Sequence, residues 1–183
     1  MIPSSELPIP ATVIVAPDGT IRLAFVDADW THRLEPAELL NALEQIATTR
    51  SKSTSKFKAG EIVPATTLES VTGEPIKLPD PDRLVDLQFR RFMDCPICNT
   101  HIAEVRRRAR EIEAAGVKQV IVFDSSARSI RSYQKDVPFA LVGDPKKALY
   151  KEFGVESSLG FLTFKFLRAA MREIGRASCR ERV

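Results

Sequence analysis

Between residues 84 and 154 the chain alternates strand-like and helix-like patterns of apolar and polar positions. Leu84 to Phe92 alternates apolar and polar side chains, which is the period of a β-strand. Val117 to Phe123 is a mostly apolar run typical of a strand buried on both faces, and Phe139 to Val142 predicts a third strand. Three helices are predicted beside these strands: from Pro96 to a stop at Gly116, from a cap at Ser125 or Ser126 to about Asp136, and from Asp144 and Pro145 to a stop at Gly154. This alternation predicts an α/β fold with βαβ crossovers and parallel strands.

The N-terminal part has a different pattern. Two apolar, β-branched runs, Ala11 to Val15 and Thr20 to Val26, are joined by Pro17-Asp18-Gly19, which is typical of a hairpin turn. Glu35 to Ile46 has leucines at helical spacing, and the polar segment Thr48 to Lys56 predicts a flexible linker. We therefore expect a hairpin-and-helix unit at 1–47, a linker at 48–56, an α/β domain at 57–158 and an apolar terminal helix at 159–172.

The last eleven residues, Glu173 to Val183, read EIGRASCRERV. This segment resembles the translation of a widely used short-read sequencing adapter. We interpret it as an artefact, in which case Cys179 is not a biological residue; a genuine basic tail is the alternative.

Composition excludes several classes of function. With 183 residues and 44% hydrophobic content, the chain can bury one ordinary core. A net charge of +3 is far from the dense basic surface of a nucleic-acid-binding protein, so we expect no nucleic-acid partner. The sequence shows neither a secretory signal nor an uninterrupted membrane span, which favours a cytoplasmic protein without a membrane partner. Three cysteines in such a chain indicate reduced thiols or redox chemistry.

Two of the cysteines form the motif Cys95-Pro96-Ile97-Cys98, between a predicted strand and a predicted helix. Backbone N–H groups at a helix start favour a thiolate, and Pro96 is tolerated in a first turn. Cys95 is therefore the predicted nucleophile, and Cys98 is close enough to attack an oxidised Cys95 and close a disulfide. Cys95 could attack a peroxide to form a sulfenic acid, or a disulfide to form a mixed disulfide; the motif leaves both reactions open.

Two other interpretations of the motif remain. Zinc usually needs four ligands, and outside the two cysteines the chain offers His32, His101 and carboxylates, so we predict no metal and no cofactor. An inert buried pair of thiols is the second alternative. His101 itself is expected to be a partly exposed helix residue and not a catalytic base.

Arginines surround the motif. Arg106, Arg107, Arg108 and Arg110 are expected on a solvated helix face. Arg90 and Arg91 lead into the motif, and strand alternation sends them to opposite faces, so at most one can hold positive potential near Cys95. We select Arg91, together with Pro96 and Pro10, as supporting residues.

Three stretches carry a family resemblance: VDLQFRRFMDCPICNTHIAEV, GVKQVIVFDSSA and VPFALVGDPKKALYKEFGVE. From about Phe57 to Glu156 the chain resembles AhpC/TSA-type peroxiredoxin-like proteins of the thioredoxin superfamily. The resemblance implies a thioredoxin-like fold with a mixed central sheet flanked by helices, a reactive Cys95, a peroxide or disulfide substrate, and an external thiol reductant of the thioredoxin or glutathione type. Typical peroxiredoxins carry Thr three residues before the reactive cysteine and Pro four before that, where this chain has Phe92 and Gln88.

The segment LPIPATVIVAPDGTIRLAFVDADWTHRLEPAELLNAL is similar to the closing strand, hairpin and last helix of the same family, here placed first. We predict that this hairpin docks beside Leu84 to Phe92 and covers an otherwise exposed sheet edge. Docking would bring Pro10, after an expected cis bond from Ile9, against Cys95. The alternative is a fusion of two partial domains without native pairing. The corresponding alternatives for function are a redox-inactive thioredoxin-fold binding module or a truncated fusion fragment.

Overall fold

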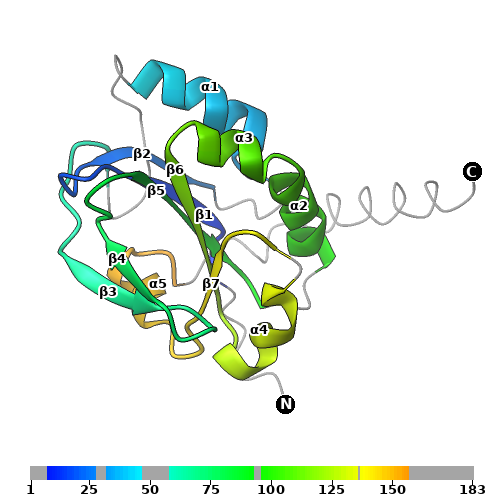
Figure 1. Cartoon of the computed structure of the whole chain (residues 1–183). Helices are drawn as coiled ribbons and strands as arrows, with labels where there is room; N and C mark the ends of the chain where they lie inside the picture. Colours follow the sequence, from blue (N-terminus) through cyan, green and yellow to red (C-terminus); the bar gives the residue numbers. More distant parts are fainter. Residues whose placement is uncertain (1–7, 28–31, 47–57, 93–95, 136, 157–183) are drawn as a thin grey trace, which may run out of the picture.

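The computed structural model describes residues 8–27, 32–46, 58–92, 96–135 and 137–156. Within these residues five strands form one sheet in the order β2-β1-β5-β6-β7 (Figure 1). The strands are β1 (Ala11–Val15), β2 (Ile21–Val26), β5 (Leu84–Arg90), β6 (Val117–Phe123) and β7 (Ala140–Gly143). β5, β6 and β7 are parallel, whereas β1 is antiparallel to both β2 and β5. The sheet is therefore mixed, as predicted.

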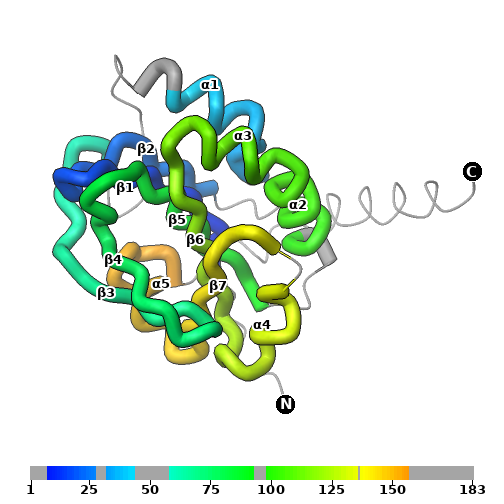
Figure 2. The backbone as a smooth tube through the Cα atoms, viewed as in Figure 1, coloured from blue at the N-terminus to red at the C-terminus, as the bar shows by residue number. Residues whose placement is uncertain are grey.

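The N-terminal hairpin is part of this sheet. β1 pairs with β5 from Ala11↔Phe89 to Val15↔Val85, so segments more than 60 residues apart in sequence lie side by side (Figure 2). The turn between β1 and β2 contains Gly19 at φ +82°, a left-handed conformation that favours glycine. The predicted docking of the hairpin beside β5, the strand that leads into the CxxC motif, is confirmed.

Helices and a small second sheet cover the two faces (Figure 1). The helices are α1 (Pro36–Ile46), α2 (Pro96–Arg107), α3 (Ala109–Ala114), α4 (Ala127–Gln134) and α5 (Ala148–Glu152). Buried residues of α1 to α4 pack with Ile14, Ile121 and Leu141 of the sheet. On the other face, α5 and the hairpin β3 (Thr66–Glu69) and β4 (Pro75–Leu78) pack with Leu87 and Phe89.

Some elements differ from the sequence expectation. The single helix predicted from Pro96 to Gly116 is wrong, because it is divided at Arg108 into α2 and α3, although the stop at Gly116 is correct. β3 and β4 were not predicted, since strands of four residues carry little periodic signal. The arginines at 106, 107 and 110 are exposed and Arg108 is half-buried, in agreement with a solvated face.

Several expectations lie outside the described residues: the linker at 48–56, the terminal helix at 159–172 and the tail at 173–183. Among the described helices, none combines the length and the apolar character needed to cross a bilayer.

Candidate redox site

The CxxC motif follows the carboxyl end of β5, a central strand of the sheet. Helix α2 begins at Pro96, directly after Cys95 in the sequence, while Cys95 itself lies outside the described residues. Cys98 lies in the first turn of α2 and is completely buried, with 0% of its surface exposed. A sulfur in this position is enclosed by the protein on all sides, so an external substrate cannot reach it without local opening.

A buried arginine contacts the Cys98 sulfur. Arg33 Nη2 donates a hydrogen bond to Cys98 Sγ at 3.3 Å, and Arg33 is only 9% exposed. Arg33 belongs to the segment between β2 and α1, so the N-terminal unit contributes directly to the surroundings of the CxxC motif. The sequence analysis missed this residue, because it lies in an aperiodic polar stretch that carries no motif.

A row of buried polar side chains extends along β5 toward this site. Asp86, Gln88 and Arg90 alternate with apolar residues and therefore share one face of the strand, the face that α1 to α3 cover. Gln88 Nε2 donates to Asp86 Oδ2 at 2.6 Å, and Arg90 Nη2 donates to Gln88 Oε1. From β6, Gln119 Nε2 donates to the same Asp86 oxygen at 3.3 Å.

His101 joins this row to the loop that carries Arg33. Its Nδ1 accepts a hydrogen bond from Arg90 Nη2 at 2.7 Å, because a guanidinium can only donate, and its Nε2–H donates to the carbonyl oxygen of Leu34 at 3.2 Å. Burial, together with Arg90 and Arg33, lowers the pKa of His101 to about 2. The expectation of a partly exposed His101 is wrong: it is 8% exposed and its neutral ring fixes the position of residue 34, next to Arg33.

Burial also shifts the charged ends of the row. It raises the pKa of Asp86 to about 6, against the opposing effect of hydrogen bonds from Gln88 and Gln119 and of the Arg90 charge. Burial and, to a smaller extent, the positive charge of Arg33 lower the pKa of Arg90 to about 10. Negative charges on Cys98 and Asp86 oppose this shift. A negative charge on Cys98 favours the protonated form of Arg90.

Replacing Asp86 by Asn is expected to stabilise the protein at alkaline pH. Because the folded-state pKa of about 6 exceeds the ordinary aspartate pKa of 3.8, the contribution of Asp86 to stability is complete below about pH 4 and is lost as pH rises through about 6. The variant should gain about 1–3 kcal/mol at pH 8 and little at pH 4, measured by urea unfolding. Asp82→Asn, at an exposed carboxyl, is the matched control. Equal stability of Asp86→Asn and the parent at pH 8 would contradict the assignment.

The supporting residues chosen from sequence lie near the same end of the sheet. The Ala11↔Phe89 pair places Pro10 beside the end of β5, and Arg91 Nε donates to the Pro8 carbonyl oxygen at 3.5 Å. The expected cis bond before Pro10 is wrong: among the described peptide bonds, the cis bond is Leu78–Pro79. Since Cys95 is outside the described residues, its proximity to Pro10 and Arg91 stays a prediction.

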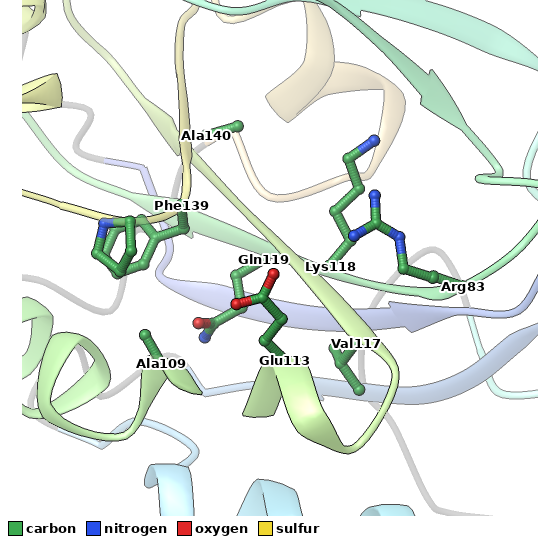
Figure 3. Close-up of a pocket in the computed structure, with 9 residues that line it drawn as sticks. Arg83, Ala109, Glu113, Val117, Lys118, Gln119, Phe139 and Ala140 are labelled. Atoms are coloured by element: carbon green, nitrogen blue, oxygen red, sulfur yellow. The ribbon is translucent and has the colours of Figure 1, made fainter. Parts of the chain in front are cut away.

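Cavities lie beside α2 and α3. One, of about 310 Å³, lies along α2 from Asn99 to Arg106 and is also lined by Phe123 and Tyr133. Another, of about 190 Å³, lies at the amino ends of β5, β6 and β7 and is lined by Arg83, Lys118 and Gln119, together with Glu113 of α3 (Figure 3). The second cavity is therefore at the opposite end of the parallel strands from Cys98. No cluster of three or more His, Cys, Asp or Glu side chains suited to a metal occurs among residues that the structure describes.

The sequence matches the AhpC/TSA family over residues 59–172, which is more than half of the chain. The protein belongs to the AhpC/TSA family. The match begins after the N-terminal unit, so Arg33 and Pro10 lie outside the part of the chain that defines this membership. The mixed sheet, with the hairpin beside the CxxC strand and helices on the flanks, is a thioredoxin-like α/β fold.

Solved structures similar to this AhpC/TSA chain include three bacterial proteins. A candidate thioredoxin from Neisseria meningitidis is 25% identical over 50% of this chain and 63% of its own, with a TM-score of 0.44. StoA from Bacillus subtilis is 21% identical over 49% and 70%, with a TM-score of 0.41. A candidate protein disulfide isomerase from Bacteroides thetaiotaomicron is 17% identical over 56% and 67%, with a TM-score of 0.48. A search of curated proteins found no match.

Within the region matched to the AhpC/TSA family, Tyr150 links the CxxC strand to its neighbour. Its hydroxyl is hydrogen-bonded to the carbonyl oxygen of Arg90, at the end of β5, and to that of Val122 in β6 at 3.0 Å. Its ring packs edge-on against Phe89 with centroids 5.1 Å apart. The Tyr of the LYKEFGV stretch therefore fixes the end of the strand that leads into the motif.

Proposed function

We propose that the protein is a thiol-dependent oxidoreductase in which Cys95 attacks a disulfide or a peroxide and Cys98 resolves the product. The burial of Cys98 carries this proposal. In a pair spaced as CxxC, a sulfur sealed inside the first turn of α2 can be reached by its neighbour but not by an external substrate. The roles are then divided: Cys95 meets the substrate and Cys98 acts second.

The position of Cys95 supports its role as nucleophile. It immediately precedes the first residue of α2, where backbone N–H groups have no partner inside the helix. These groups and the positive end of the helix dipole favour a thiolate. Membership of the AhpC/TSA family is consistent with thiol redox chemistry at this motif.

The proposed reaction with a disulfide has two steps. The Cys95 thiolate attacks one sulfur of the substrate, forms a mixed disulfide and expels the other sulfur as a thiolate, which takes a proton from water. The Cys98 thiolate then attacks the Cys95 sulfur, forms the Cys95–Cys98 disulfide and expels the second substrate thiolate. The substrate is reduced by two electrons, and an external thiol of the thioredoxin or glutathione type returns the protein to the dithiol form.

Two positions favour a disulfide over a peroxide as the oxidant. At the place of the typical peroxiredoxin threonine stands Phe92, 39% exposed and without a hydroxyl to orient a peroxide. At the place of the typical proline stands Gln88, which is engaged in the buried row of β5. The peroxide reaction is the second candidate, supported by the family.

Stopped-flow oxidation of the reduced protein separates the two oxidants. We expect a small aromatic disulfide to oxidise Cys95 faster than it oxidises free cysteine, because the helix start raises the thiolate fraction near neutral pH. Hydrogen peroxide is expected to react no faster than with free cysteine when both rates are expressed per thiolate. A peroxide rate far above that of free cysteine would reverse the preference, and two rates equal to those of free cysteine would contradict the proposal.

A further inference from the structure

We propose that Arg33 holds Cys98 as a buried thiolate, so that the resolving step needs no general base. This inference rests on the proposed function, because it assigns how the second sulfur of the same site becomes reactive. The complete burial of Cys98 by itself disfavours the charged thiolate and favours the neutral thiol. The contact with Arg33 is the feature that reverses this tendency.

The geometry of the contact suits an anionic sulfur. Arg33 Nη2 points its hydrogen at Cys98 Sγ from 3.3 Å, and both side chains are at least nine-tenths buried. A guanidinium is always protonated and can only donate, so a charge-assisted hydrogen bond forms when the acceptor is a thiolate. Water screens such a bond little at this depth, and an opposite charge at this range favours the ionised form.

The other groups around the sulfur are compatible with the same charge. Arg33 from the loop before α1 donates to the sulfur, and a charge on Cys98 acts on Arg90 of β5 and Tyr150 of α5. His101 of α2 lies beside both arginines. A negative Cys98 favours the protonated form of Arg90. His101 is neutral, and burial raises the pKa of Tyr150 well above its usual value, so the phenol stays uncharged. Of the carboxyls, Glu35 and Asp86 interact with Arg90.

The loop that carries Arg33 is held in place independently of the sulfur. His101 Nε2 donates to the carbonyl oxygen of Leu34, and Arg90 holds the other ring nitrogen of His101. These bonds connect α2 and β5 to the residue next to Arg33. The guanidinium is therefore preorganised, and little side-chain freedom remains to be lost when the thiolate forms.

A Cys98 thiolate held by Arg33 would assist both the resolving step and its reverse. In the mixed disulfide, Cys98 attacks Cys95 as a thiolate and expels the substrate thiolate, with no proton to remove first. In the reverse step an external thiolate attacks the Cys95 sulfur, and Cys98 leaves as a thiolate that Arg33 stabilises. In both directions one S–S bond forms and one breaks.

The test is an ultraviolet thiolate titration of Cys98 as the sole cysteine. The variant Cys95→Ser with Cys179→Ser leaves one thiol and gives position 95 an uncharged side chain, as in the mixed disulfide. We expect a titration midpoint below the reference of about 8.5. Adding Arg33→Gln should raise the midpoint by about 1–3 pH units. Arg33→Lys should keep most of the low midpoint, and Arg110→Gln, on the exposed face of α3, should not move it.

The outcomes distinguish this inference from the proposed function. A midpoint at or above about 8.5 in the parent variant overturns the role of Arg33, whatever the arginine variants do. An unchanged midpoint in a folded Arg33→Gln variant also overturns the role of Arg33. If Arg33→Gln does not fold, a midpoint near the reference value in Arg33→Lys overturns it instead. A low midpoint beside an unreactive Cys95 would leave the inference intact and contradict the proposed function.

Discussion

A chain that begins at Lys58 is expected not to fold. β1 lies between β2 and β5, so removing the N-terminal unit leaves β5 without its antiparallel partner. The buried apolar side chains lost with it include Val13, Ile14, Val15, Ile21 and Leu39. Burial of each contributes about 1.5–3 kcal/mol, which together matches the whole stability of a typical domain, about 5–15 kcal/mol. Circular dichroism and a thermal melt should show no cooperative transition.

Complementation provides the control for this truncation. A peptide covering residues 8–46, added to the shortened chain, should restore a cooperative melt, because it supplies β1, β2 and α1. If the chain from Lys58 melts as cooperatively as the full protein, the N-terminal unit is not part of the native sheet, and the interpretation of the chain as a fusion without native pairing gains support.

Replacing Cys95 by Ser is expected to slow the reaction with a disulfide by at least about a hundredfold. The remaining motif sulfur, Cys98, is 0% exposed, so an external disulfide reaches it only after local opening. An opening free energy of about 3 kcal/mol is enough for a hundredfold decrease. Stopped-flow measurement of thiol loss gives the rate, with Cys179→Ser in both proteins so that only the motif thiols are counted.

The tail cysteine supplies the matched control, since Cys179→Ser should leave the fast phase unchanged. A Cys95→Ser variant that retains the fast phase would show that Cys98 is the more reactive thiol. In that case the two roles would be exchanged, and the contact between Arg33 and Cys98 would belong to the attacking sulfur.

Much of the fold follows from local sequence pattern. The bounds of β1 and β6 agree with the predicted runs, since strongly apolar, β-branched segments leave little choice of structure. The pairing of β1 with β5 was predicted because a central strand with an open edge needs a partner. The break at Arg108 was not predicted, because apolar spacing continues through it from Val105 to Ala109.

The surroundings of Cys98 could be predicted only in part. The motif itself and its place before a helix are local features, and sequence pattern found them. The contact with Arg33 joins residues 65 positions apart, and the bond from His101 to Leu34 depends on how α2 packs against a loop. Such contacts arise from tertiary packing and leave no periodic trace in the sequence.

The most direct test of the central claim is the mass of the Cys98→Ser variant after brief exposure to a model disulfide. Without a resolving sulfur, the reaction should stop at the mixed disulfide, and peptide mapping should find one adduct at the motif, on Cys95. The Cys95→Ser variant should carry none at the motif in the same time. An adduct on Cys98 in Cys95→Ser at an equal rate, or the absence of any adduct on Cys95, would contradict the assignment of Cys95 as nucleophile and Cys98 as resolving cysteine.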